Sequence, residues 1–385
     1  MYLPSYFNDF LSNIRLSPNQ KNDLIKGHKT LVKRLKEDKD LAPYIVSIFL
    51  QGSYRRYTAV APVNGKRADV DVIIVTRFDK NSVTPEQAIE KFIPFVEKHY
   101  KGKYEIQGRS IGIELSYVDL DIVVTAAPSE ADEELLRSES VTTMLTLEDS
   151  IVAQDWKLIK SWLEPGHRSG DLIDIQKSYS EQAEWKTEPL HIPDREANCW
   201  IDTHPLEQIR WTQQKNKDTN GHYVNVVKSL KWYRKINLVN LKYPKGYPIE
   251  HMIGDCCPDE ISSVAEGIML TLENIVSSYQ TNYLTGQVPT LPDRGVPDHN
   301  VWKRVSIEDF KSFYDSIKEA AVIARKAYEA DTVKEAVANW QILFGKKFPD
   351  APDDGNNDSG DSTTNPSGGF SSRKNPTIIG GGRFA

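Results

Sequence analysis

The spacing of apolar and polar positions predicts a helix followed by strands in the first part of the chain. Over residues 6–38, leucines recur at helical spacing among many lysines, which indicates a helix with one buried side. Residues 45–50 and 70–75 are short runs rich in isoleucine and valine, and each predicts a strand. The first run is followed by a Gly-Ser pair, which we interpret as a turn.

Another helix and three more strands are predicted before residue 150. Thr84 precedes Pro85, and Gln87 stands three positions after the threonine, so these residues predict a capped helix that continues to residue 100. Further strands are predicted at residues 104–107, 111–115 and 118–124. Strands interrupted by a helix predict an α+β fold with a mixed sheet, and we assign this lobe, with its N-terminal helix, to residues 1–150.

The remainder of the chain is predicted to be mainly helical, with a tail. Helices are predicted at residues 151–163, 205–216, 223–236, 261–283 and 307–330. They indicate a helical lobe over residues 151–348, within which residues 164–198 are polar and show no clear pattern. From residue 349 a run rich in Asp, Asn, Gly and Ser lacks apolar anchors, so residues 349–385 are predicted to form a flexible tail.

Composition narrows the class of protein. The chain has 385 residues, of which 39% are hydrophobic and 26% charged, as in ordinary soluble proteins. Its net charge of −6 argues against a protein that coats duplex DNA, because such proteins carry a basic face. No apolar run has the length of a membrane span, and the N-terminus lacks the order of a signal peptide, so we expect a cytoplasmic protein.

The most informative chemistry is a pair of aspartates on the second strand. Asp69 and Asp71 are two residues apart, so their side chains point to the same face of the strand. Gly52 and Ser53 precede them in a turn that suits phosphate, because glycine admits backbone amides close to the oxygens and serine adds a hydroxyl. Magnesium is usually held by one or two carboxylates together with substrate phosphates. The segment therefore predicts a magnesium-dependent reaction on a nucleotide.

A third carboxylate is available on a later strand. Asp121 begins the β-branched part of the strand at residues 118–124, and Asp119 is the alternative ligand. Three carboxylates can hold two Mg²⁺ ions about 4 Å apart, which activate an attacking hydroxyl and stabilise a leaving pyrophosphate. For Asp69 alone, capping of a local backbone group is the competing interpretation.

These motifs resemble those of the polymerase-β-like nucleotidyltransferases. Residues 52–56 and 68–71 are similar to the Gly-Ser and Asp-x-Asp motifs, and residues 121–124 to the strand of the third carboxylate. Within that superfamily, residues 1–348 resemble the bacterial enzymes related to cyclic GMP–AMP synthase and 2′-5′ oligoadenylate synthetase, the CD-NTases of CBASS anti-phage systems. The resemblance implies a nucleotidyltransferase lobe and a helical lobe with the active site between them.

The resemblance also implies roles for residues of the helical lobe. Thr203 would face the acceptor base, and Tyr247 would stack on the donor base. Lys231 would bind the donor triphosphate, with Lys228 as its neighbour one turn earlier. Without the resemblance, Lys231 would be interpreted as a solvated lysine and Tyr247 as a packing residue in a Gly/Pro-rich turn.

A family member of this kind makes a cyclic di- or trinucleotide from ATP and other nucleoside triphosphates. The implied cofactor is a pair of Mg²⁺ ions, with Mn²⁺ as a substitute, and the product would activate a downstream effector during phage infection. The chain looks nearest the clade that makes adenine-containing cyclic trinucleotides, and we expect no DNA activator. The alternatives are a transferase that adds one nucleotide to an RNA, protein or small molecule, and a non-catalytic scaffold that presents its tail to a partner.

Two further features carry hypotheses. His251 with Cys199, Cys256 and Cys257 has the composition of a Cys₃His zinc site, whereas buried thiols and a solvated histidine are the alternative. Some relatives are encoded beside ubiquitin-activating (E1) and ubiquitin-conjugating (E2) enzymes that act on the synthase's C-terminus. The tail ends in three glycines and Arg-Phe-Ala, so Ala385 is predicted to be such an acceptor, the alternative being a solubilising tail.

Overall fold

The structure is a computed structural model that describes residues 1–63, 65–127 and 189–352. The described residues up to Ala351 belong to one compact unit. The helix predicted at residues 151–163 and the proposed acceptor Ala385 lie outside the described residues. The division of the chain at residues 150 and 348 stays a prediction.

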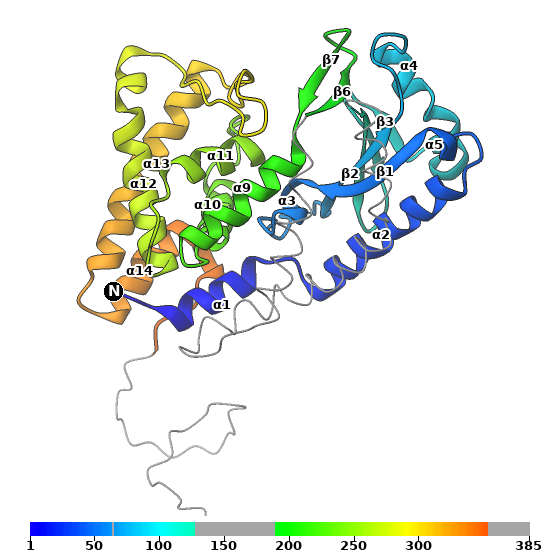
Figure 1. The fold of residues 1–385 in the computed structure, drawn as a ribbon. Coiled ribbons are helices and arrows are strands. Elements are labelled where there is room, and N and C mark those ends of the chain that lie inside the picture. The colour runs from blue at the N-terminus through cyan, green and yellow to red at the C-terminus, as the bar shows by residue number, and fades with distance from the viewer. Residues whose placement is uncertain (64, 128–188, 353–385) are drawn as a thin grey trace, which may run out of the picture. The chain divides into compact units, whose positions relative to one another are not determined.

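Within the described residues, seven strands form a single mixed sheet (Figure 1). Its main path runs in the order β1-β2-β5-β4-β3, with β6 beside β5 and β7 beside β6. The strands are β1 (Ile45–Gln51), β2 (Asp69–Thr76), β3 (Tyr104–Ile106), β4 (Ile111–Glu114), β5 (Asp119–Ala126), β6 (Leu190–Asp194) and β7 (Cys199–Thr203). The pair β2 and β5 is parallel, while β1 with β2 and β4 with β5 are antiparallel, so the predicted α+β fold with a mixed sheet is confirmed.

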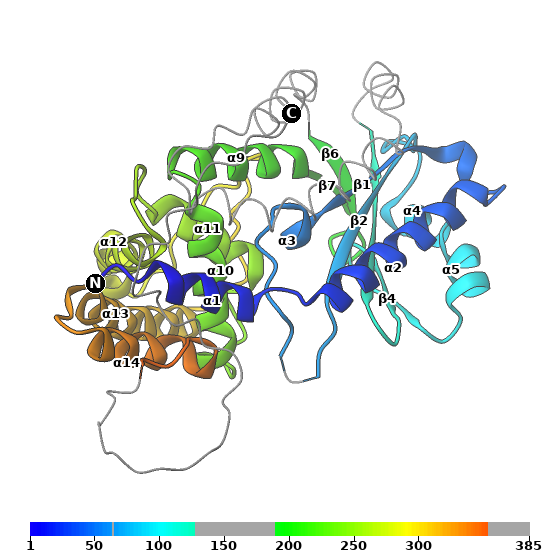
Figure 2. The same ribbon diagram turned by 90° about the horizontal axis from the view of Figure 1, so that it is seen from below.

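Three helices cover one face of this sheet. They are α2 (Pro18–Glu37), α4 (Pro85–Glu90) and α5 (Ile93–Tyr100), and Figure 2 shows α2 running beside the strands. Leu24 and Leu31 of α2 and Phe95 of α5 join one buried cluster with apolar residues of β2 and β5, among them Val72, Ile74, Ile122 and Val124. The predicted capping box at Thr84 is present, because its side chain accepts from the backbone N–H of Gln87 and the glutamine side chain accepts in return.

The helix predicted at residues 6–38 is in fact two helices. The first, α1 (Pro4–Ile14), ends before Ser17, whose side chain forms a capping box with Gln20 at the start of α2. Pro18 stands in the first turn of α2, where its missing N–H costs nothing, whereas inside a continuous helix its ring would clash with the preceding turn. The uniform leucine spacing concealed this break.

The other helices form a second hydrophobic cluster, which α1 joins. They are α9 (Pro205–Asp218), α10 (Tyr223–Asn237), α11 (Gly246–Cys256), α12 (Val264–Thr285), α13 (Ile307–Glu329) and α14 (Val333–Phe344). The predicted helices at 205–216, 223–236, 261–283 and 307–330 are confirmed, although α12 begins at Val264. Phe7 and Phe10 of α1 contact Trp340, Phe344 and Phe348 edge to face and in stacks.

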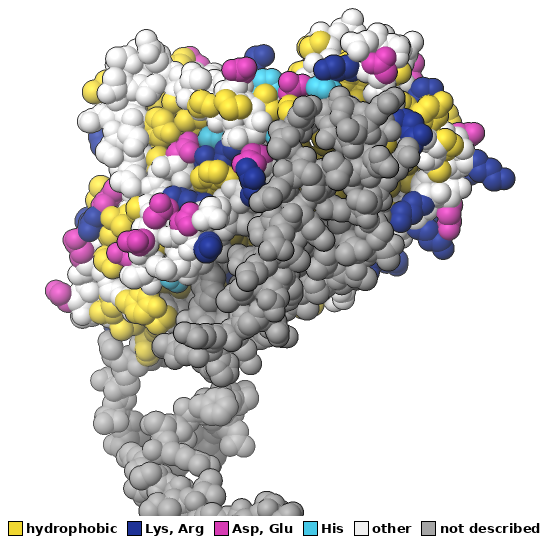
Figure 3. Space-filling view, viewed as in Figure 1, with side chains coloured by type: hydrophobic (Ala, Val, Ile, Leu, Met, Phe, Trp, Pro, Cys, Tyr) yellow, Lys and Arg dark blue, Asp and Glu magenta, His cyan; other side chains and the backbone are white. Residues whose placement is uncertain are grey.

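The surface of the helical part is mixed in charge. On the face shown in Figure 3, acidic and basic side chains are interspersed over it. Among the described helices, none has the length and apolarity that a membrane crossing requires.

Candidate active site

The pairing of two parallel strands brings the predicted carboxylates together. Asp69 on β2 lies opposite Asp119 on β5, and Asp71 lies opposite Asp121. Neighbouring strands are about 4.8 Å apart, and residues two apart share a face. The four carboxylates therefore gather on one face, at the start of both strands.

Gly52 lies directly against this group. It begins α3 (Gly52–Arg55), a short helix where the sequence analysis expected a turn, and its φ is +77°. A Cβ at position 52 would be 1.8 Å from Oδ2 of Asp71. Glycine is therefore required both by the backbone conformation and by the carboxylate, and Ser53 follows it at the same edge.

The acidic cluster carries an unfavourable concentration of charge. Burial, together with the charges of Asp69 and Asp121, raises the pKa of Asp71 to about 7. Burial and the charges of Asp69 and Asp119 also raise the pKa of Asp121. A divalent cation would relieve this repulsion, so the cluster suits a positively charged ligand.

Of the two aspartates on β5, the structure favours Asp121 as the third ligand. Asp119 is engaged by Arg67, whose Nε lies 2.6 Å from its Oδ1, and Glu114 binds the same guanidinium at 3.1 Å. An aspartate that is neutralised in this way is a weaker candidate for a metal. Asp121 faces Asp71 directly across the two strands.

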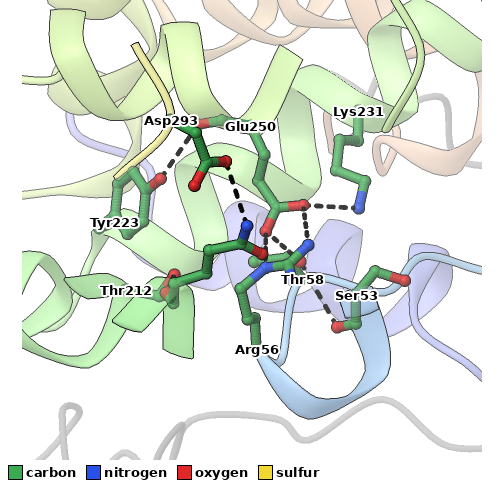
Figure 4. Close-up of polar contacts among 9 residues, drawn as sticks. Ser53, Arg56, Thr58, Thr212, Tyr223, Lys231, Glu250 and Asp293 are labelled. Atoms are coloured by element: carbon green, nitrogen blue, oxygen red, sulfur yellow. Dashed lines mark hydrogen bonds and ion pairs between the residues drawn. The ribbon is translucent and has the colours of Figure 1, made fainter. Parts of the chain in front are cut away.

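The lysine predicted to bind the donor triphosphate is held by a residue that the sequence analysis did not single out. Lys231 Nζ lies 3.2 Å from Oε2 of Glu250 (Figure 4). The other oxygen, Oε1, accepts hydrogen bonds from Nε of Arg56 at 2.9 Å and from Oγ1 of Thr58 at 2.7 Å. Burial alone would raise the pKa of Glu250, but Arg56 and Lys231 outweigh it and hold the pKa at about 2. Glu250 is therefore a buried anion shared by two cations.

Helix α10 presents three lysines on one side. Lys228, Lys231 and Lys235 are spaced by three and four residues, so they follow one another along the helix face. Lys235 donates to the carbonyl oxygen of Ala61 at 3.0 Å. Burial and the charge of Lys231 lower the pKa of Lys235 to about 8, against an opposing effect of Asp69. Its spacing from Lys231 is the signal that could have identified Lys235 from the sequence.

Tyr247 lies in the first turn of α11, and the interpretation of its segment as an irregular turn was wrong. Pro248 fits this helix because it stands within the first turn. The guanidinium of Arg56 lies over the Tyr247 ring, 5.0 Å from its centroid. One face of the ring is thus covered, and a base could stack only on the other.

Thr203 is not beside the carboxylates. It is the last residue of β7 and pairs with Leu190 of β6, which joins the sheet next to Ala126 at the end of β5. Asp121 is five residues earlier on that strand, roughly 16 Å at 3.3 Å per residue. Contact of Thr203 with an acceptor base stays a prediction. It requires an acceptor nucleotide whose base reaches Thr203 while its ribose lies beside the carboxylates.

Asp69, Asp71 and Asp121 fit the chemistry of magnesium. All three supply carboxylate oxygens, and their mutual repulsion is of the kind that a cation offsets. In the described parts of the chain, no group of three or more His, Cys, Asp or Glu side chains forms a cage that could hold a metal ion. Magnesium does not need such a cage, because water and substrate phosphates complete its octahedron.

The zinc hypothesis fails on the same observation, because a structural Cys₃His site needs four protein ligands in place. Cys199 is exposed on β7, whereas Cys256 and Cys257 are buried at the end of α11. His251 is also buried, against the expectation of a solvated ring, and its Nδ1 lies 3.2 Å from Asp255. Cys256, Cys257 and His251 are packing residues.

The chain is similar to known proteins over nearly its whole length. Residues 1–130 match the family described as the Second Messenger Oligonucleotide or Dinucleotide Synthetase domain. A probable cyclic AMP-AMP-GMP nucleotide synthase of Salmonella paratyphi B is 47% identical over 357 residues, which are 91% of this chain and 92% of that protein. A cyclic AMP-AMP-GMP synthase of Enterobacter hormaechei is 45% identical over 355 residues, with the same coverage of 91% and 92%.

Solved structures share the fold at low sequence identity. The Bradyrhizobium diazoefficiens CD-NTase CdnG in complex with GTP has a TM-score of 0.62 at 10% identity, covering 89% of this chain and 95% of that one. Escherichia coli CdnC, solved in complex with a HORMA protein, has a TM-score of 0.58 at 14% identity, covering 90% and 98%.

Proposed function

Because the chain belongs to the CD-NTases, the bacterial nucleotidyltransferases that synthesise cyclic oligonucleotides, we propose that it joins two ATP and one GTP into cyclic AMP-AMP-GMP. The product is proposed from the names of the two relatives that are 45% and 47% identical. In the cell this product would act as the signal of an anti-phage system.

The observation that carries the site assignment is the register that places Asp71 beside Asp121, with Gly52 against the same carboxylate. Asp69 and Asp71 would hold two Mg²⁺ ions, for which Mn²⁺ can substitute, and Asp121 would complete the first of the two sites. Bound Mg²⁺ would stabilise negative charge on the triphosphate. Asp121 would also assist removal of the proton from the attacking ribose hydroxyl.

The nucleotides would be held by groups on both sides of this cluster. Gly52 and Ser53 would bind the donor phosphates from α3, and Lys231 would bind them from α10, with Lys228 one turn earlier. Tyr247 would stack on the donor base through the face opposite Arg56. Thr203 would contact the base of the acceptor.

Incubation of the purified protein with Mg²⁺ and labelled ATP and GTP tests the proposal. We expect a phosphatase-resistant product with the mass of a cyclic trinucleotide containing two adenosines and one guanosine. A product from ATP alone would correct the bases, and a linear, phosphatase-sensitive product would contradict cyclisation. Labelling of an added RNA or protein instead would favour the single-nucleotide transferase.

We also propose that Ala385 is conjugated by an E1- and E2-type enzyme, as the resemblance implies. Support comes from the C-terminal sequence alone, and the solved complex of the distant relative CdnC contains a HORMA protein instead. Intact-mass analysis of the protein from cells with and without such an enzyme would test this. A C-terminal adduct in the first cells is the expected result, and its absence there would contradict the proposal.

A further inference from the structure

We infer that Glu250 is a positioning residue for the donor triphosphate, acting through Lys231 and Arg56. This inference rests on the proposed function of the site and names a residue that neither the motifs nor the relatives assign. Glu250 stands on α11, and its carboxylate is buried among charged and polar partners (Figure 4).

The two oxygens of Glu250 have different partners. Oε1 accepts from Arg56 Nε and Thr58 Oγ1, at 2.9 and 2.7 Å. Oε2 receives Lys231 Nζ at 3.2 Å and a longer contact from Arg56 Nη2 at 3.5 Å. The carboxylate thus links α10 to the segment that follows α3, and it is 3% exposed.

The partners of Glu250 lead directly to the proposed phosphate site. The backbone N–H of Thr58 donates to the carbonyl oxygen of Ser53 at 2.9 Å, so Glu250 also braces the segment that begins with Gly52. Arg56 is buried and pairs with Glu250, and the charges of Glu250 and Asp71 both favour its charged form. A single anion therefore sets the positions of two cations, Arg56 after α3 and Lys231 on α10.

The backbone that carries Glu250 is itself fixed. The hydroxyl of Tyr223, which is 1% exposed, donates to the backbone carbonyl of Glu250 at 3.2 Å. Tyr223 begins α10, the helix of Lys231, so the carboxylate and the lysine are supported from the same helix. This rigidity is what a positioning residue needs, because it lets the lysine meet a triphosphate without a large loss of side-chain entropy.

Removal of the carboxylate should displace Lys231. Arg56 and Lys231 would repel one another without their shared anion, and Lys231, whose side chain is 10% exposed, can turn toward solvent. The triphosphate would then lose its contact with Lys231. Binding of AMP, which has a single phosphate, would depend less on this contact. If Glu250 instead competed with the triphosphate for Lys231, removal of its charge would strengthen triphosphate binding rather than weaken it.

The test is Glu250→Gln in the full chain. Glutamine keeps an oxygen for Arg56 and Thr58 but presents an amide N–H₂ to Lys231. With Mg²⁺ present, we expect affinity for a non-hydrolysable ATP analogue to fall about tenfold, affinity for AMP to change less than about twofold, and KM for ATP to rise more than kcat falls. Lys231→Met should show the same loss, and the double variant should lose no more than Lys231→Met alone.

Controls separate positioning from folding and from the proposed function. Glu273→Gln removes a carboxylate of α12 that pairs with Arg325 of α13, and this variant should bind both nucleotides as the wild type does. If Glu250→Gln does not fold, Glu250→Asp can replace it, because aspartate keeps the charge but is one methylene shorter. This variant should weaken binding of the ATP analogue more than binding of AMP. Unchanged or tighter analogue binding, an equal loss for AMP, or additive effects with Lys231→Met would overturn the inference. A wild type that binds no analogue would instead overturn the proposed function.

Discussion

Gly52 and Asp71 are in contact so close that no side chain can stand between them: a Cβ on residue 52 would lie 1.8 Å from Asp71 Oδ2. The contact joins the end of β1 to the strand that carries the carboxylates, whose register pairs Gln51 with Asp71. It fixes one predicted phosphate-binding residue and one predicted metal ligand relative to each other.

Gly52→Ala should therefore slow synthesis about 100-fold. The new methyl must push Asp71 or the backbone by an ångström or more, a displacement that can cost about 100-fold in rate. Gly102→Ala is a matched control, because Gly102 has a similar φ of +69° but no atom within 4 Å of its Cβ position. Both variants should lose roughly 1–2 kcal/mol of stability, but product formation should slow only in the first. Normal synthesis by Gly52→Ala would show that the contact is not needed.

The two aspartates on β5 should respond differently to removal of charge. Asp121→Asn should lower the rate of pyrophosphate release on the order of 10²–10⁴-fold, as for loss of a group that assists proton transfer. Asp119→Asn breaks a half-exposed pair with Arg67 and should cost less than about tenfold. Circular dichroism should show both variants folded. The reverse order of effects would assign Asp119 as the third ligand.

Metal-free protein should lose stability as the pH rises toward 7. The pKa of Asp71 is raised from 3.8 to about 7, so the folded state retains a proton that the unfolded chain releases. Its contribution to stability is present below pH 4 and is lost by about pH 7, with an upper bound of about 4 kcal/mol. In EDTA, Asp71→Asn should thus unfold at a higher temperature than the wild type at pH 8, with a smaller difference at pH 5. The exposed Asp331→Asn should show no such trend.

Phe348 should be needed for the stability of the folded protein, whereas the residues after 351 should not. It is 1% exposed and packs against Phe7, Phe10 and Trp340. Phe348→Ala should reduce the free energy of unfolding by about 3–5 kcal/mol in denaturant titrations. Ile342→Ala, on α14 but 60% exposed, should change it by less than about 0.5 kcal/mol. A chain that stops after residue 351 should match the full-length protein in the same titration.

The parts of the fold that the sequence predicted are those with strong local signals. The β-branched runs became β1, β2 and β5, and the Thr84 capping box forms as expected. By contrast, the break at Ser17 lay inside an unbroken leucine pattern. Helix α11 was missed because its first turn contains a glycine and a proline, which are common in irregular turns as well as at helix starts.

The site shows a similar division. Asp69 and Asp71 could be found because strand periodicity alone puts them on one face. Glu250 could not, since its partner Arg56 is 194 residues away and only the tertiary structure brings them together. Its carboxylate also stands in a helix whose existence the local sequence did not indicate.

The docking of α1 has a consequence for how the enzyme is made. Five residues at the start of the chain, Leu3, Phe7, Phe10, Leu11 and Ile14, are buried in a cluster whose other buried members run from Val60 to Phe348. Domains of a nascent chain tend to fold in order from the N-terminus, yet these first residues must wait for the last to leave the ribosome. A polypeptide cut at residue 130, the end of the matched family region, would leave that apolar face in water. Translation through Phe348 is thus expected to precede folding of this cluster, and a message truncated before that codon should yield no folded synthase.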